Sequence, residues 1–369
     1  MSKYGRNSID IDAIKILQES NLEVGTKTDG SPTVSLSQIH DEVAYYRVML
    51  NYIAKLERMN YPPIIFGLVP KNGLPCGLTE DGKKLLTIVN NATLVFKHQK
   101  YYRLHPKLAC LCNFIVKHEL HEMLELGRVD GKVREKLTEK LKILLRELKS
   151  YQLMCQTYAF MKGARKNTVS LRKYVDGLFQ RYSRLLVLRV DLSYKREFRD
   201  SLSIDEILKH KDALLKNRRK GALAATWVGY ACRLEYAPET GFHFHLLVFK
   251  NGADFRSDVF HAGLILDEWQ LITGARGRGF NCNMKAKDGG YRFCGIGVVN
   301  HDDKEKRQYL HKAVAYLTKS DLVAKLTLEK RRTFFKGTLP KKVTARGRPR
   351  VKTCTQSRQP VQQLRLVGV

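Results

Sequence analysis

Apolar residues in the first half of the chain recur at the spacing of an α-helix. Between residues 37 and 58 they fall at steps of three and four, at Ile39, Val43, Tyr46, Leu50 and Ile53. A second run, which continues to Ala164 with Lys and Glu between its apolar positions, contains Val133, Leu137, Leu141, Leu144 and Leu148. This period matches one face of a helix. We therefore predict a mostly helical region over residues 1–165, of unknown role and interrupted by a loop around residues 62–75.

The pattern changes near residue 184, where short apolar runs replace the helical spacing. The run 185–192 predicts a buried strand, and the runs 225–236 and 242–249 predict a hairpin around the turn-rich sequence Ala-Pro-Glu-Thr-Gly. Helices are predicted after Ser203, around 259–269 and over 304–320, with further short strands over 280–284 and 291–299. The order β-α-β-β-α-β-β-α favours an α+β fold over residues 180–340, in which an antiparallel sheet carries helices on one face.

The net charge restricts the possible classes of function more than the rest of the composition does. The chain has 66 Lys and Arg against 36 Asp and Glu, which gives a net charge of +30. Such a surface attracts polyanions, and nucleic acid is the commonest partner. After Glu329 there is no acidic residue, while Lys and Arg number 12, so residues 341–369 are expected to form a flexible basic tail. Its expected DNA-binding residues are Lys341, Lys342, Arg346, Arg348 and Arg350.

The sequence Arg-Gly-Arg-Pro at 346–349 looks like the core of an AT-hook, a segment that lies in the minor groove of A·T-rich DNA. Because four residues are a short signal, we favour the other interpretation, a basic tail that binds DNA through charge alone. No apolar stretch approaches the roughly 18 residues that a membrane-spanning helix needs, and the opening residues lack the apolar core of a secretory signal. We therefore expect no membrane partner and a cytoplasmic location.

Two histidines in the second strand of the predicted hairpin have the pattern of metal ligands. Successive side chains of a strand point to opposite faces, so His243 and His245 share one face. If the two strands pair across a five-residue turn, Glu235 lies opposite His243, and a shift of one residue would turn it away. Two imidazoles and a carboxylate leave coordination positions open for a substrate oxygen on a divalent cation. Asp191 or water is the alternative third ligand.

The last predicted helix carries two Tyr-x-x-Lys sequences, which comprise Tyr309, Lys312, Tyr316 and Lys319. At 100° per residue these side chains lie within about 80° of one another, beside an apolar face that would dock the helix on the sheet. A tyrosine hydroxyl is mostly protonated at neutral pH, so it becomes a nucleophile when a base or a positive charge lies nearby. Lys319 and a metal ion are the expected sources of that charge. Both tyrosines are therefore candidates, and a structural role is the alternative for Tyr309.

Five blocks of the second half resemble, in order, the filamentous-phage (inovirus) gene II-type replication protein family of the HUH endonuclease superfamily. The blocks are LLVLRVDLSYK, RLEYAPETGFHFHLLVF, LDEWQLITGARGRGFNCN, YRFCGIGVV and AYLTKSD. The resemblance spans about residues 180–340 and leaves out the helical first half and the tail. It implies that His243 and His245 bind a divalent cation, Mg²⁺ or Mn²⁺, and that Tyr316 is the nucleophile. The seven-residue spacing from Tyr309 departs from the Tyr-x-x-x-Tyr of two-tyrosine members, so the number of active tyrosines stays open.

The activity that this resemblance implies is initiation of rolling-circle replication. Tyr316 would attack one strand of origin DNA, leave a 5′-phosphotyrosine and a free 3′-hydroxyl that primes a polymerase, and later rejoin the strand. Origin DNA, a host helicase and a host polymerase are the expected partners, in the cytoplasm of a bacterial host cell. A relaxase or a single-strand transposase would share this chemistry, and a noncatalytic DNA-binding regulator would bind without nicking. A metallohydrolase of small substrates would leave the charge of +30 unexplained.

Overall fold

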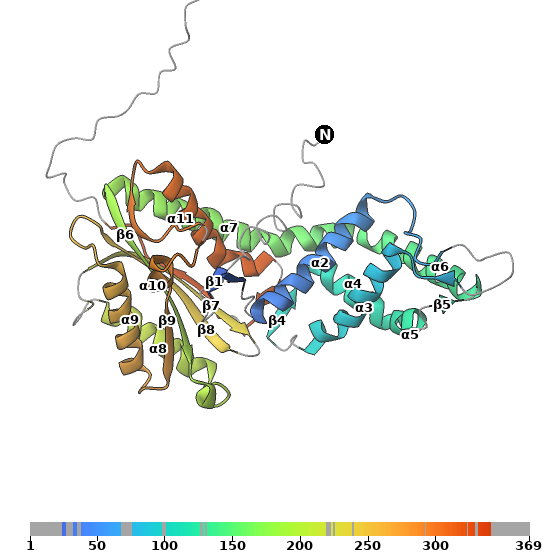
Figure 1. Cartoon of the computed structure of the whole chain (residues 1–369), viewed down its shortest axis with the longest axis horizontal. Coiled ribbons are helices and arrows are strands. Elements are labelled where there is room, and N and C mark those ends of the chain that lie inside the picture. Colours follow the sequence, from blue (N-terminus) through green and yellow to red (C-terminus); the bar gives the residue numbers. More distant parts are fainter. Residues whose placement is uncertain are drawn as a thin grey trace, which may run out of the picture.

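The computed structural model describes residues 24–26, 32–34, 38–67, 76–97, 101–125, 128–129, 131–218, 223, 226–237, 240–291, 293–322, 324–328 and 331–340. Figure 1 shows an elongated molecule, with helices at one end, a β-sheet at the other and the long helix α7 (Tyr151–Arg181) running through both. In the described part of the chain, no helix is long and apolar enough to span a membrane. The tail residues Lys341, Lys342, Arg346, Arg348 and Arg350 lie outside the described residues, so their role stays a prediction.

The first half is helical, as its apolar spacing predicts. Its helices are α2 (Gln38–Arg58), α3 (Glu80–Lys97), α4 (Pro106–Lys117), α5 (Leu120–Glu125) and α6 (Gly131–Leu148). Short strands lie between them, namely β1 (Val24–Thr26), β2 (Pro32–Val34), β3 (Cys76–Gly77), β4 (Tyr102–Leu104) and β5 (Arg128–Val129). Leu50 and Ile53 of α2 and Leu141 and Leu144 of α6 meet in one hydrophobic core. The periodic positions are therefore the buried ones.

A serine cap divides the helical run that the sequence predicts to continue through 133–164. α6 ends at Leu148, and the Ser150 hydroxyl accepts a hydrogen bond from the backbone N–H of Leu153 at 3.3 Å. Because such a cap satisfies a free N–H of a new helix, it favours a helix start over continuation. α7 then extends for 31 residues. Its second half packs on the sheet through Leu171, Val175 and Leu178.

Antiparallel strands form the sheet of the second half. They are β6 (Arg184–Tyr194), β7 (Trp227–Ala237), β8 (Gly241–Asn251), β9 (Gly277–Asn281), β10 (Gly297–Asn300) and β12 (Phe334–Lys336). Their order is β10-β6-β8-β7-β12, and β9 pairs with the other half of β6. A separate strand, β11 (Ala324–Leu326), pairs with β4 of the helical half. The α+β fold with an antiparallel sheet is thus confirmed.

Helices cover both faces of this sheet, so the prediction of helices on one face is wrong. α8 (Ile204–Asn217) and α9 (Asp258–Ile272) pack on the face that carries Leu186, Leu188 and Val190. α7, α10 (Cys282–Lys287) and α11 (Lys304–Lys319) pack on the opposite face, with Leu185 and Val187. The two layers lie on either side of the strands in Figure 1. A nearly continuous apolar run such as that of β6 is typical of a strand buried on both faces.

The two short strands predicted after α9 differ from the observed ones: β9 (Gly277–Asn281) begins and ends three residues before the predicted strand 280–284, and β10 is shorter than the predicted strand 291–299. β9 ends at Asn281, whose side-chain oxygen accepts hydrogen bonds from the backbone N–H groups of Asn283 and Met284 and begins α10. β10 covers Gly297–Asn300, so only residues 297–299 of the predicted strand 291–299 are in a strand. A local side-chain cap therefore ends the first strand where the apolar pattern predicts that it continues.

Candidate active site

The β7–β8 hairpin brings the predicted metal ligands together. Glu235 pairs directly with His243, as a five-residue turn predicts, and His245 follows two residues later on the same face. One ligand atom from each of Glu235, His243 and His245 lies within 4.8 Å of the other two. Two imidazoles and one carboxylate form a set that suits a divalent cation and leaves positions open for a substrate. The structure therefore confirms the predicted grouping.

Hydrogen bonds orient both imidazoles so that the same nitrogen faces the centre. His243 Nδ1 donates to the backbone oxygen of Gly241 at 3.0 Å, and His245 Nδ1 donates to Asp191 Oδ1 at 2.7 Å. His245 Nε2 lies 3.4 Å from Glu235 Oε2. His243 Nε2 is buried and has no hydrogen-bond partner within the described part of the chain. A buried nitrogen without a partner is costly, and a metal ion on Nε2 would satisfy it while the Nδ1 hydrogen bonds hold the rings.

Two partly buried carboxylates make this centre attractive to a cation. Burial opposes the charge of Glu235, yet its hydrogen bond with His245 and the nearby Arg233 lower its pKa to about 2. Burial also opposes the charge of Asp191, but His245 and Arg189 hold its pKa below the usual range. His245 shifts in the other direction, because Asp191 and Glu235 outweigh burial and raise its pKa to about 9. A proton and a metal ion therefore compete for Nε2 of His245.

Helix α11 brings Tyr316 against this centre. Its apolar side packs into the core of the sheet through Leu310, Val314 and Leu317. The ring of Tyr316 meets the ring of His245 edge to face, with centroids 5.6 Å apart. The guanidinium of Arg189 lies 4.8 Å from the centre of the Tyr316 ring. A phenol, a fixed positive charge and a set of metal ligands thus lie together at one face of the sheet.

A buried ion pair anchors the chain just beyond α11. Arg233 is 1% exposed, and its guanidinium donates to both carboxylate oxygens of Asp321, in one case at 2.9 Å. Its Nε also lies 3.9 Å from Oε1 of Glu235. Arg233 and Glu235 are alternate residues of β7 and share a face. The ion pair therefore couples the end of α11 to the strand that carries a metal ligand.

The remaining predicted residues of α11 have other surroundings. Tyr309 donates its hydroxyl hydrogen bond to Glu305 one turn earlier, and its ring lies 5.2 Å from the ring of Phe293. Lys312 lies 4.3 Å from the centre of the same Phe293 ring. Tyr316 is thus the tyrosine of this helix that contacts a candidate metal ligand, His245. The side chain of Lys319 lies outside the described residues, so its role stays a prediction.

Two charged residues of β6, Arg189 and Asp191, complete the site. Arg189 is not among the residues predicted for the site, and Asp191 is predicted only as an alternative third metal ligand. In the structure, Asp191 instead accepts a hydrogen bond from Nδ1 of His245, the nitrogen that faces away from the centre. Charged residues in an otherwise apolar buried strand are rare unless paired, and that signal marks both positions. Their partners depend on the pairing of β6 with β8, which the local pattern does not contain.

A family model covers the part of the chain that holds this site. Residues 148–337 match the model described as the YagK/YfjJ C-terminal domain. The match begins at the last residue of α6 and ends just after β12, so it includes α7, the sheet, the candidate metal ligands and Tyr316. No curated protein and no solved structure matches the chain.

Proposed function

The chain belongs to the YagK/YfjJ C-terminal domain family, and we propose that it nicks and rejoins one strand of DNA with Tyr316 as the nucleophile. The observation that carries this proposal is the contact of Tyr316 with His245, within a set of side chains that suits a divalent cation. The resemblance of the sequence blocks to HUH replication initiators supports the same chemistry. A net charge of +30 supports a polyanionic substrate.

The proposed reaction is an in-line displacement at phosphorus. A divalent cation, Mg²⁺ or Mn²⁺, bound by Glu235, His243 and His245 would polarise the scissile phosphate. The phenol oxygen of Tyr316 bonds to phosphorus while the bond from phosphorus to the 3′ oxygen breaks. The Tyr316 hydroxyl releases its proton, and the departing 3′ oxygen takes one up. The products are a free 3′-hydroxyl and a 5′-phosphotyrosine.

The surrounding residues of the chain orient and charge this centre. Asp191 and the backbone oxygen of Gly241 fix the rings of His245 and His243 through their Nδ1 atoms. The positive charge of Arg189, whose guanidinium lies over the Tyr316 ring, would favour the deprotonated form of the phenol, which is the form that attacks. Since the phosphoester energy is kept in the tyrosine link, a later attack by a 3′-hydroxyl rejoins the strand and needs no nucleotide triphosphate.

In the cell, this chemistry fits a rolling-circle replication initiator acting at an origin in the cytoplasm of a bacterial host, with a helicase and a polymerase supplied by that host. A relaxase or a single-strand transposase has the same chemistry and differs in the DNA that it selects. A noncatalytic DNA-binding regulator would bind the same DNA and form no covalent adduct.

The test is to incubate the protein with Mn²⁺ or Mg²⁺ and a supercoiled plasmid that carries its own genetic element, and to map protein-linked 5′ ends. Tyr316→Phe keeps the ring and its packing but removes the attacking oxygen, so it should eliminate the adduct while DNA binding persists. Tyr309→Phe is the matched control on the same helix and should still form it. DNA found on Tyr309 alone in peptide mapping would contradict the assignment, and DNA on both residues would establish two nucleophiles.

A further inference from the structure

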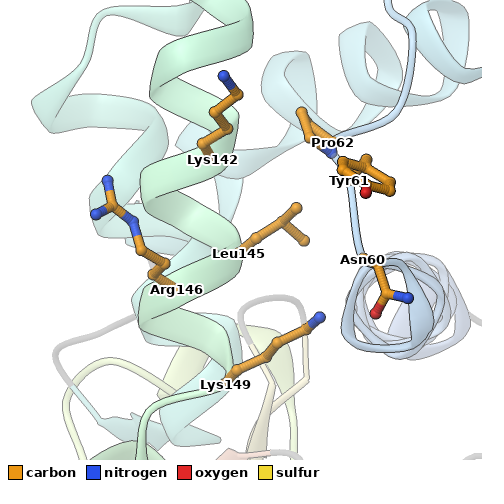
Figure 2. Close-up of a pocket in the computed structure, with 7 residues that line it drawn as sticks. All are labelled: Asn60, Tyr61, Pro62, Lys142, Leu145, Arg146 and Lys149. Carbon is orange, nitrogen blue, oxygen red and sulfur yellow. The ribbon is translucent and has the colours of Figure 1, made fainter.

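The helical half contains a basic hollow, whose residues are distant in the sequence from the candidate metal ligands. It has a volume of about 590 Å³, within the roughly 300–1,000 Å³ of ordinary ligand pockets. Its lining comes from the segment after α2 and from the end of α6, and comprises Asn60, Tyr61, Pro62, Lys142, Leu145, Arg146 and Lys149. Figure 2 shows Leu145 and, just after α6, Lys149 pointing toward Asn60 and Tyr61, with Lys142 above them, while Arg146 projects from the opposite side of the helix.

The charge of this lining favours an anionic ligand. Lys142, Arg146 and Lys149 are cationic, and no described residue of the lining is acidic. Lys142 pairs with the exposed Glu139 at 2.6 Å, a surface contact that contributes little energy. Arg146 is exposed, and its guanidinium has no ion-pair partner among the described side chains. Lys149 donates to the backbone oxygen of Met59 at 2.5 Å and so holds the edge of the hollow. Lys142 and Arg146 are the cations available to a ligand.

An exposed aromatic ring distinguishes the hollow from a simple cation patch. Tyr61 is 80% exposed and stands beside Pro62 at the edge opposite α6. Aromatic side chains next to basic ones are the usual means by which proteins hold a single strand, because an unpaired base stacks on the ring while cations contact the phosphates. A duplex keeps its bases stacked and paired, so it would use the cations and leave Tyr61 unused.

A stripe of exposed side chains leads from the hollow along α7. The helix begins two residues after Lys149, and its exposed positions recur at steps of three and four, at Tyr151, Met154, Tyr158, Lys162 and Lys166. This spacing keeps them on one face of the helix. In Figure 1, α7 runs from the helical end of the molecule to the sheet. Helix α11, which contains Tyr316, packs on that sheet. The exposed aromatic and basic residues therefore follow the helix that joins the helical half to the sheet.

We propose that the hollow between α2 and α6 is a binding site for single-stranded DNA, with phosphates on Lys142 and Arg146 and a base on Tyr61. The inference rests on the proposed function in one respect: the bound single strand is the DNA strand that nicking releases. It gives the helical half a role in retaining that strand while the 5′ end stays linked to Tyr316 of α11.

The test measures binding of a labelled oligothymidylate, longer than the roughly 4–16 nucleotides of a single-strand site, to the full chain in EDTA at several salt concentrations. Lys142→Gln/Arg146→Gln should reduce the slope of log affinity against log salt by about 1.4, which is about 0.7 for each phosphate that a cation no longer neutralises. Lys132→Gln/Lys136→Gln removes the same charge from exposed positions of α6 outside the hollow and should leave the slope unchanged. Tyr61→Leu should weaken binding at least about fivefold without changing the slope or duplex binding.

Equal slopes for the two double variants, or unchanged affinity for Tyr61→Leu, would overturn the proposal. Equal losses of single-strand and duplex affinity in Tyr61→Leu would also overturn it. The substituted side chains are exposed, and matching thermal unfolding curves verify the fold. Because EDTA prevents metal-dependent nicking, failure of this site leaves adduct formation at Tyr316 intact. Failure of the wild-type chain to form an adduct leaves the binding differences intact.

Discussion

The chemistry of the site depends on which nitrogen of each imidazole is free. Nδ1 of His243 and Nδ1 of His245 are both used in hydrogen bonds, to a backbone oxygen and to Asp191. Nε2 of each ring is left to face Glu235 and the centre. Asp191 therefore orients a candidate metal ligand, His245, without belonging to the candidate set itself, as carboxylates that bind metal-ligating histidines commonly do.

This assignment predicts a graded loss of metal binding. His243→Ala or His245→Ala should abolish binding of Mn²⁺ in calorimetric titration, because each removes a ligand. Asp191→Asn should weaken it about 10- to 100-fold, since the ring of His245 loses its orienting partner. DNA binding in EDTA should be unchanged in all three variants, because phosphate contacts come from a distributed basic surface. Glu235→Gln should also weaken metal binding, and an unchanged titration would assign the third position to Asp191 or water.

Metal affinity should depend on pH through His245. Its pKa is raised to about 9 in the folded chain, so at pH 7 a metal ion must displace one proton from this imidazole. Apparent affinity should rise about tenfold per pH unit between about 7 and 8.5 and level off near 9. The same shift stabilises the metal-free fold below the ordinary pKa of histidine, and this contribution is lost as pH rises toward 9. Calorimetry in buffers of different ionisation enthalpy should detect one proton released at pH 7. No release would exclude Nε2 of His245 as a ligand.

Among the elements, α11 has the most demanding position, because it must place one side chain against a strand of the sheet. Leu310, Val314 and Leu317 bury its apolar side, and the Arg233–Asp321 ion pair fixes the chain after its last turn. The segment before β10 approaches the backbone of α11 closely at Gly295. A Cβ on this glycine would lie 2.5 Å from Cα of Leu310 and closer still to its nitrogen.

Gly295→Ala should therefore displace α11 and with it Tyr316. The added methyl group meets backbone, which cannot rotate away, so we expect a destabilisation of about 1–3 kcal/mol and a loss of adduct formation. Gly263→Ala is the matched control, because its Cβ in α9 would meet nothing within 4 Å. It should stabilise the helix by about 0.5–1 kcal/mol. Thermal unfolding and adduct yield measure both effects, and a fully active Gly295→Ala with an unchanged unfolding midpoint would disprove the close approach.

The whole molecule combines an elongated shape with a net charge of +30. α7 alone extends for about 46 Å at 1.5 Å per residue, and it contributes to the sheet core at one end and to the exposed stripe at the other. DNA that reached both ends would contact cations over much of this length. Residues 341–369 add eight Lys and Arg to the charge of the chain, and they lie outside the described residues.

Deleting residues 341–369 should reduce the salt dependence of DNA binding. The deletion removes eight Lys and Arg and no acidic residue, so the net charge falls from +30 to +22. The slope of log affinity against log salt for duplex DNA should decrease by up to about 7, or about 0.9 for each phosphate that the tail neutralises. The nicking position should not move, because the site lies within 180–340. An unchanged slope would show that the tail does not touch DNA.

Helices, and side chains that share one face of a hairpin, depend on residues close together in the sequence, so they could be predicted without knowledge of the fold. A period of three to four predicted the helices of the first half, and a period of two with a five-residue turn put Glu235, His243 and His245 on one face. These are local geometric relations, so no distant contact had to be known. The same reasoning failed at Ser150 and Asn281, where side-chain caps changed the course of the backbone.

Which distant groups meet was settled by the packing of the whole chain. The pairing of β6 with β8 brought Asp191 to His245, and the docking of α11 brought Tyr316 to the same imidazole and to Arg189. Helices on the second face of the sheet also follow from packing between segments far apart in the chain. Periodicity shows which side of an element is apolar, but burial is non-directional and does not specify the partner that covers it. The partner follows from how all the elements pack at once.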